Sequence, residues 1–205
     1  MRFLRIGCAE FIPKADYGGK MSDITKRAIA ASLKNLLKEK KLNKITVQDI
    51  ADDCGINRQT FYYHFQDIYD LVEWICIEDT EKVLKENRTY ETWQEGFLSV
   101  FELAKKDKIF IDNIYHSVSL EVLEQYLYRL VYSLLKNVVD EKSKEIPARE
   151  EDKKWIADFY KYAFVGVLLD WIRNDMAKSP EEIVDRVART VGGSVESALH
   201  NFRGR

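Results

Sequence analysis

The stretch from Thr46 to Phe65, TVQDIADDCGINRQTFYYHF, concentrates side chains that can bind a nucleic acid. Arg58, Gln59 and Thr60 are consecutive within it. An arginine can bind guanine bidentately, a glutamine can bind adenine in the same way, and a threonine methyl can pack on thymine. These three residue types therefore predict contacts to base edges.

Donors for phosphate groups surround these three residues. Tyr62, Tyr63 and His64 follow directly, and their hydroxyl or imidazole groups are of the kind that contacts the DNA backbone. Thr46 offers a hydroxyl at the expected start of a helix, where the helix N-terminus also favours an anion. Lys44, just before it, adds a positive charge. Together these residues predict binding to double-stranded DNA.

Single residues in this set have simpler alternatives. Arg58 could instead form a surface ion pair with Asp52 or Asp53, which would contribute little energy. His64 could be an ordinary solvated helix residue. The prediction therefore depends on the whole set and on the elements that would hold it.

Two short helices joined by a glycine turn would position these side chains. Thr46 has an acidic residue three positions later, which is the pattern of a capping box at a helix start. Gly55 allows a tight turn, and Asn57 can cap a second helix. Phe61 and Phe65 are four residues apart and would both face the interior. This order of elements indicates a helix-turn-helix.

The stretch resembles the DNA-binding domain of the TetR/AcrR family of bacterial regulators. The resemblance covers about residues 24–75 and rests on ITVQDIA at 45–51, GIN at 55–57, TFYYHF at 60–65 and the leucine at 71. It implies DNA contacts from seven residues. They are Thr46, Arg58, Gln59, Thr60, Tyr62, Tyr63 and His64.

The chain departs from the family pattern in one place. The family usually has a phosphate-binding lysine near the start of its fourth helix, whereas this chain has Ile68 there. Lys44, or Lys26 and Arg27 in the first helix, would have to compensate for the lost contact.

The rest of the chain is also expected to be helical. Nine Gly and three Pro in 205 residues leave long stretches without a helix breaker. The fold class predicted is all-α, with an N-terminal three-helix helix-turn-helix domain and a C-terminal helical bundle used for dimerisation. Besides the two short helices, the expected helices span about 22–40, 67–86, 92–105, 108–115, 119–139, 153–176 and 180–202, with a charged loop at 140–152.

Three parts of the chain are expected from this pattern. Residues 1–21 form a leader, either a disordered arm or an extension upstream of a native start at Met21. Residues 22–66 form the helix-turn-helix domain. Residues 67–205 form a helical domain for ligand sensing and dimerisation.

Composition argues against other classes of protein. Apolar residues make up 46% and charged residues 32%, as in a globular protein, and no apolar run is long enough to span a membrane. Three cysteines without C-x-x-C spacing indicate a reducing cytosol, with no metal site and no cofactor. No Glu-x-x-His pair, P-loop, G-x-S-x-G or H-E-x-x-H motif occurs, so we predict no catalytic residue and a non-enzymatic cytoplasmic protein.

Charge is divided unevenly along the chain. Residues 1–65 carry 12 basic against 7 acidic residues, and residues 66–205 carry 20 against 27. A basic N-terminal part on an acidic body is typical of a protein that approaches a polyanion with one end.

A homodimer is expected because pseudo-palindromic DNA requires a two-fold symmetric protein. The apolar stripes of the last two predicted helices are the candidate interface, and an ordinary intrachain core is the alternative. The candidate interface residues are Phe164, Val167, Leu168, Trp171, Val184, Val187, Val191, Val195 and Leu199.

The C-terminal part resembles a subgroup of the family, the regulators related to the dihydroxyacetone-kinase activator. The resemblance rests on YDLVEWI at 69–75, FYKYAFVG at 159–166 and LDWI at 169–172. It implies a response to a small-molecule effector or to a metabolite-sensing partner protein. Aromatic residues of the body are candidates for lining a ligand pocket, although such residues more often belong to a core. They are Trp93, Phe97, Tyr115, Tyr126, Trp155 and Tyr160.

The sequence thus predicts a sequence-specific transcriptional regulator that binds a pseudo-palindromic operator as a homodimer. The alternative is a protein-interaction module, or a coactivator-dependent activator, with weak intrinsic DNA binding.

Overall fold

The computed structural model describes residues 19–84 and 89–203, which form helices and contain no strand. Within that part of the chain the predicted all-α fold is confirmed. The elements are α1 (Gly19–Leu36), a 3-10 turn η1 (Leu42–Lys44), α2 (Val47–Cys54), α3 (Arg58–His64), α4 (Ile68–Leu84), α5 (Trp93–Lys106), α6 (Lys108–Ser117), α7 (Leu120–Ser143), α8 (Glu150–Arg173), α9 (Pro180–Val191) and α10 (Ser194–Phe202).

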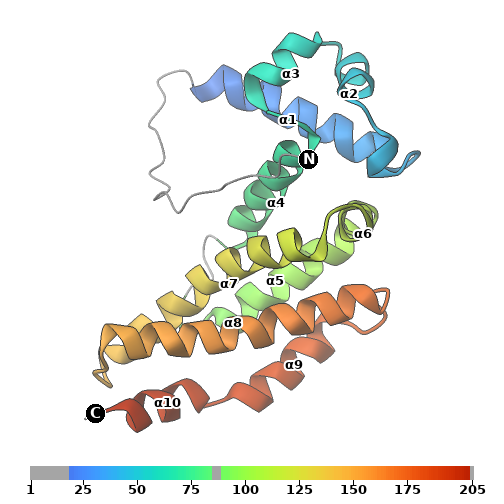
Figure 1. Cartoon of the computed structure of the whole chain (residues 1–205). Coiled ribbons are helices and arrows are strands. Elements are labelled where there is room, and N and C mark those ends of the chain that lie inside the picture. The colour runs from blue at the N-terminus through green and yellow to red at the C-terminus, as the bar shows by residue number, and fades with distance from the viewer. Residues whose placement is uncertain (1–18, 85–88, 204–205) are drawn as a thin grey trace.

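Helices α1, α2 and α3 gather at one end of the molecule, and α4 leads from this end into the body (Figure 1). We call α1, η1, α2 and α3 the N-terminal unit and α4 to α10 the C-terminal body. Helix α7 lies along α8, and α9 and α10 cover the far side of the body. None of the helices described is long and apolar enough to cross a membrane.

Local signals determine where the short helices of the N-terminal unit begin. The Thr46 hydroxyl accepts a hydrogen bond from the Asp49 backbone N–H, and the Asp49 carboxylate accepts one in return, so the predicted capping box is formed. The Asn57 side chain accepts from the Thr60 N–H at 2.7 Å and starts α3. Phe61 is completely buried, so α3 is held by its inner face while its outer face stays in solvent.

Gly55 ends α2 with a left-handed backbone at φ 66°, as the glycine turn requires. A Cβ added here would meet nothing within 4 Å, so only the backbone conformation resists a side chain. We expect Gly55→Ala to lower the free energy of unfolding by about 1–2 kcal/mol. Gly55→Asn should lower the free energy of unfolding by less, because asparagine tolerates the left-handed backbone region. Urea unfolding of both variants measures the difference, and an equal loss in both would contradict the backbone explanation.

Helix boundaries differ from the predictions at two places near the termini. Helix α1 begins at Gly19 and ends at Leu36, whereas the helix was predicted at about residues 22–40. Of the expected leader, residues 1–18 lie outside the described residues. The single helix predicted for 180–202 is divided in two, because Gly192 and Gly193 separate α9 from α10 and Gly193 adopts φ 71°.

The charged loop predicted at 140–152 is much shorter in the structure. Helix α7 continues to Ser143, and α8 already begins at Glu150. Three acidic residues occupy the first turn of α8, where negative charge favours the helix N-terminus. Lys136 of α7 binds Asp140 at 2.6 Å and Glu150 at 2.7 Å, and so joins the two helix ends across the turn.

Candidate nucleic-acid interface

The outer face of α3 carries the side chains predicted to contact DNA. Arg58 and Gln59 are exposed at its first turn, and Tyr62 and Tyr63 are 50% and 83% exposed. Thr60 is half-buried, and its hydroxyl hydrogen-bonds to the Asn57 side chain at 3.0 Å. These residues therefore share the solvent-facing side of α3, and α3 lies at one end of the molecule (Figure 1).

Arg58 lies along α3 and contacts Tyr62. Its Nη2 lies 3.5 Å from the Tyr62 hydroxyl, and its guanidinium carbon lies 6.0 Å from the centre of the Tyr62 ring. Asp52, one of the two acidic residues considered as its partner, instead accepts a hydrogen bond from Gln48 at 2.7 Å. Because this contact to Tyr62 is long and Asp52 has another partner, the Arg58 charge remains available to DNA.

Thr46 is more constrained than the sequence indicates. Its hydroxyl and its backbone N–H both bind Asp49 Oδ2, at 2.6 Å and 2.8 Å. Hydrogen bonds from the Thr46 hydroxyl and from Lys40 hold the pKa of Asp49 well below its usual range. Because this carboxylate stays ionised and keeps the hydroxyl, a phosphate here would bind the N–H groups of the first turn of α2.

His64 lies at the end of α3 next to α1. Burial and the nearby charge of Lys26 both lower the pKa of His64, so its ring is neutral near pH 7 and can donate one hydrogen bond. The Tyr63 ring packs edge-on against it, with centroids 4.9 Å apart. Lys26 therefore adds a cation close to this face, and Lys44 is exposed at the end of η1.

The start of α4, where the family pattern has a lysine, is occupied by carboxylates. Asp67 Oδ1 accepts from the backbone N–H groups of Tyr69 and Asp70 at 2.8 Å and 2.9 Å. Asp70 Oδ2 in turn accepts from the Gln66 N–H at 2.8 Å. Ile68 itself is half-buried. This helix start is therefore negative and already hydrogen-bonded, which disfavours a phosphate.

Most candidate dimer residues lie in the core of a single chain. Phe164, Leu168, Trp171, Val184, Val195 and Leu199 are between 0% and 9% exposed. Their burial favours the alternative, an ordinary intrachain core, over a dimer interface. Helices α5 and α7 already cover the inner side of α8. The other three candidates are half-buried and line an open groove of about 840 Å³ between α8 and α9. They are Val167, Val187 and Val191.

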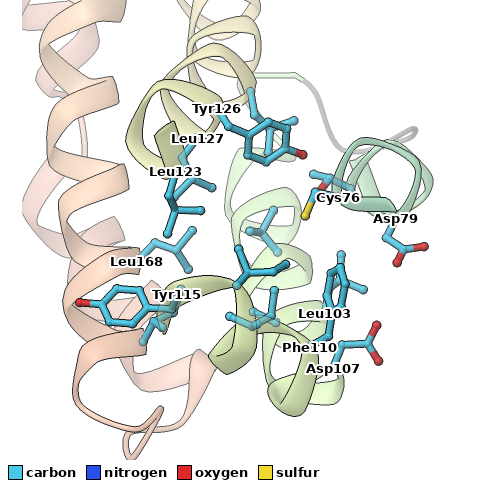
Figure 2. Close-up of a pocket in the computed structure, with 17 residues that line it drawn as sticks. Cys76, Asp79, Leu103, Asp107, Phe110, Tyr115, Leu123, Tyr126, Leu127 and Leu168 are labelled. Carbon is cyan, nitrogen blue, oxygen red and sulfur yellow. The ribbon is translucent and has the colours of Figure 1, made fainter. Parts of the chain in front are cut away.

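The pocket candidates are also divided. Tyr115 and Tyr126 line a small cavity in the body, shown in Figure 2. Trp93 and Phe97 pack on Phe164, at centroid distances of 5.6 Å and 4.6 Å, and belong to the main core.

Neighbouring positions on α8 explain the two remaining candidates. Tyr160 is buried, and its hydroxyl donates to Ser194 Oγ at 2.6 Å. Trp155 is 65% exposed, because it lies on the outer face of α8 while Ile156 faces inward. Neither lines the cavity of Figure 2.

A set of ionic contacts that sequence reasoning missed joins the N-terminal unit to the body. Lys34 of α1 binds Asp79 of α4 at 2.7 Å and also binds Asp107, which lies between α5 and α6. Burial acts to lower the pKa of Lys34, but the hydrogen bonds and negative charge of both aspartates outweigh it and raise the pKa overall. These residues are 45 and 73 positions apart, so no local pattern could reveal the contact.

Comparison with protein families matches most of the chain. Residues 28–75 match the model for bacterial regulatory proteins of the tetR family. Residues 91–193 match the model for a TetR-type transcriptional regulator C-terminal region.

A curated relative matches part of the chain. It is the HTH-type dhaKLM operon transcriptional activator DhaS of Lactococcus lactis subsp. lactis, which is 33% identical over 96 residues. The match covers 47% of this chain and 51% of the relative, so the chain spans about half the length of the curated relative it matches.

Solved structures share the fold over most of their length. The dihydroxyacetone kinase operon activator DhaS superposes with a TM-score of 0.69 at 23% identity, covering 85% of this chain and 98% of that one. RolR, solved in complex with resorcinol, gives a TM-score of 0.56 at 15% identity, covering 90% and 96%. At these identities the likeness concerns the fold. The two family matches show that the chain belongs to the TetR family of helix-turn-helix, DNA-binding transcriptional regulators.

Proposed function

We propose that the chain binds a pseudo-palindromic operator as a homodimer through the outer face of α3. Residues 22–66 would form the DNA-binding domain and residues 67–205 the sensing and dimerisation domain. The observation that carries the proposal is the exposure of Arg58, Gln59 and Tyr63 on one helix. These side chains are exposed on a helix whose opposite face, at Phe61, is completely buried. In a helix-turn-helix, the start of the second helix lies in the major groove.

Fluorescence anisotropy on DNA tests this proposal. The full chain is titrated with the intergenic duplex upstream of its own gene and with a scrambled duplex, each at two salt concentrations. We expect binding to the native duplex to be at least about a thousandfold tighter and to weaken with salt. Equal binding to both duplexes would contradict sequence-specific recognition of this DNA.

The outer face of α8 supports a revised dimer interface. Trp155, Phe159 and Tyr162 are 65%, 62% and 56% exposed, and they project from successive turns of one helix. Tyr162 also lines the groove between α8 and α9. We call these three side chains the aromatic ridge. A group of large, exposed aromatic side chains on a folded protein commonly marks an interface. A second copy, with its own ridge and groove, offers a complementary two-fold symmetric surface.

Phe159→Asp should therefore weaken the dimer. A charge in the centre of an apolar interface removes an aromatic anchor, and we expect the dimer Kd to rise at least about 30-fold. Sedimentation velocity over a concentration series measures this change. Val122→Asp is the matched control, because Val122 is 54% exposed on α7 and outside the ridge. If Phe159→Asp raised the dimer Kd no more than Val122→Asp does, this interface would be excluded.

The acidic start of α4 favours a second candidate function. Asp67 and Asp70 lie on either side of Ile68, which stands where the family pattern has a phosphate-binding lysine that would strengthen DNA binding by a single dimer. In this second function the chain is an activator that binds DNA weakly by itself. It binds DNA tightly only together with a coactivator protein. Anisotropy would show weak, salt-sensitive binding that tightens only when the partner is added.

An effector is the remaining part of the proposal. RolR was solved with resorcinol, and DhaS is named for the operon of a dihydroxyacetone kinase. We infer that the body of this chain likewise changes DNA affinity or partner recruitment in response to a small molecule or to a metabolite-sensing partner protein. The cavity of Figure 2 and the contacts of Lys34 support a route from the body to the N-terminal unit.

A further inference from the structure

The connection between α1 and α2 is rich in positive charge. Residues 38–44, KEKKLNK, contain four lysines and one glutamate, and all four lysines are exposed. We call these residues the basic turn. It joins α1 to α2 within the N-terminal unit (Figure 1). Clustered lysines on one edge of a DNA-binding unit favour contact with a polyanion.

The backbone of the basic turn is fixed by its buried neighbours. Leu42 is 3% exposed, and its N–H donates a hydrogen bond to Asn113 Oδ1 at 3.2 Å. Ile45, just after the turn, is also buried. The Lys44 N–H donates to the Lys41 carbonyl at 2.8 Å. Residues three apart lie on the same side of a 3-10 turn, so Lys41 and Lys44 present their ammonium groups to solvent together.

The four lysines differ in what they bind within the chain. Lys40 pairs with the Asp49 carboxylate at 2.9 Å and so neutralises the negative charge at the start of α2. Lys38 donates to the Asn35 side chain at 3.0 Å. Lys41 and Lys44 form no ion pair with another described residue. These two charges are therefore available to an external anion.

The start of α4 cannot supply the corresponding charge. Ile68 stands where the family pattern has a lysine, and the carboxylates of Asp67 and Asp70 lie beside it. Lysine contacts to phosphates provide most of the sequence-independent affinity of a DNA-binding protein. In this chain the basic turn offers such lysines at a different edge of the N-terminal unit.

The position of the basic turn places it beside the bases that α3 would read. Lys44 precedes Thr46, the first residue of the α2 cap, by two positions, so their Cα atoms are at most about 7 Å apart. Phosphates on one strand follow one another about every 3.4 Å of helix axis, so neighbouring phosphates lie within reach of these lysines. The eight residues of α2 span about 12 Å and separate the basic turn from the start of α3.

We propose that Lys41 and Lys44 bind DNA phosphates to one side of the bases that α3 reads, and that this contact replaces the charge missing from α4. The inference rests on the proposed binding of DNA through α3. Lys40 assists by keeping the Asp49 carboxylate from repelling the same strand. Because phosphates carry no direct sequence information, the basic turn strengthens binding to every duplex and leaves base preference unchanged.

A double variant, Lys41→Gln with Lys44→Gln, removes the two available charges. Both side chains are exposed, and the buried Leu42 and Ile45 stay in place, so the melting temperature should be unchanged. The matched control is Lys144→Gln with Arg203→Gln. It removes the same charge from two exposed positions that follow α7 and α10, at the opposite end of the molecule from the N-terminal unit (Figure 1).

Anisotropy over a salt series, on the native and the scrambled duplex, measures the phosphate contacts. Each contact contributes about 0.9 to the slope of log K against log salt concentration, so a dimer that loses four contacts should have a slope shallower by about 3–4. We expect the double variant to bind both duplexes at least about tenfold more weakly, by a similar factor, and the control to change less than about twofold. A slope equal to that of the control, or a loss confined to the native duplex, would overturn the proposal.

Neutral phosphates locate the contact on the DNA. A series of native duplexes each carries one uncharged methylphosphonate in place of a phosphate. At one or two positions in each half-site, the replacement should weaken the wild type several-fold and leave the double variant unaffected, because the variant has already lost that contact. Equal losses in the two proteins at every position would exclude a phosphate contact from Lys41 or Lys44.

These measurements separate this inference from the proposed function. A wild type that prefers its native duplex, with an unchanged salt slope in the double variant, would contradict the role of the basic turn and leave sequence-specific recognition standing. A wild type without that preference would contradict sequence-specific recognition of this DNA. A shallower slope of the double variant on scrambled DNA would then still support the phosphate contact.

Discussion

Phe61→Ala is expected to destabilise the N-terminal unit by about 3–5 kcal/mol, because it removes a fully buried aromatic ring. Phe61 has no exposed surface, and its ring lies 5.8 Å from that of Phe65 and 5.6 Å from that of Tyr62. The alanine leaves a cavity under α3 that two short helices cannot close. Urea denaturation followed by circular dichroism measures the loss.

Tyr63→Ala is the matched control, since Tyr63 is also on α3 but is 83% exposed. We expect its free energy of unfolding to stay within about 0.5 kcal/mol of the wild type. Both variants should bind DNA more weakly, Phe61→Ala through loss of the folded unit and Tyr63→Ala through loss of a contact. If Phe61→Ala proved as stable as Tyr63→Ala, α3 would not depend on its buried face.

Gln59→Ala is expected to change base preference. A bidentate glutamine contributes about 1–3 kcal/mol of discrimination, so affinity for the operator should fall about 5- to 150-fold. Affinity for an operator altered at the contacted base pair should fall far less, because the wild type has already lost that contact there. Gln59 is exposed at the first turn of α3, so the substitution leaves the fold unchanged.

Tyr63→Ala again provides the comparison, now for specificity. Its contact is expected to be with the backbone, which carries no direct sequence information, so affinity should fall by a similar factor on every duplex. Anisotropy of both variants on the operator, on single-base variants and on scrambled DNA separates the two patterns. If both variants lost affinity by the same factor on every duplex, Gln59 would not contact a base.

Features that depend on a few neighbouring residues could be predicted from the sequence. The capping box at Thr46, the cap at Asn57 and the turn at Gly55 are each formed within about four residues, and all three are present. The inward position of Phe61 follows from helical spacing in the same way. These local rules determine the direction of α3, and so the set of side chains that it exposes.

Spacing could not decide which apolar side chains of the long helices lie inside the chain. Trp155 and Tyr160 are both aromatic residues of α8, yet one is 65% exposed and the other is buried. Because α8 is apolar around much of its circumference, the helices that pack on it, α5, α7 and α10, determine which side is covered. The aromatic ridge therefore emerges from the packing of the body.

The amino-acid sequence by itself determined the helical class, the helix-turn-helix and the outward residues of α3, because hydrogen bonds and apolar contacts between near neighbours encode them. Only the tertiary structure decided the rest. It brings Lys34 to Asp79 and Asp107, and it closes a cavity around Tyr126 from five helices. Those contacts join residues far apart in the chain, and their geometry exists only once the helices have packed.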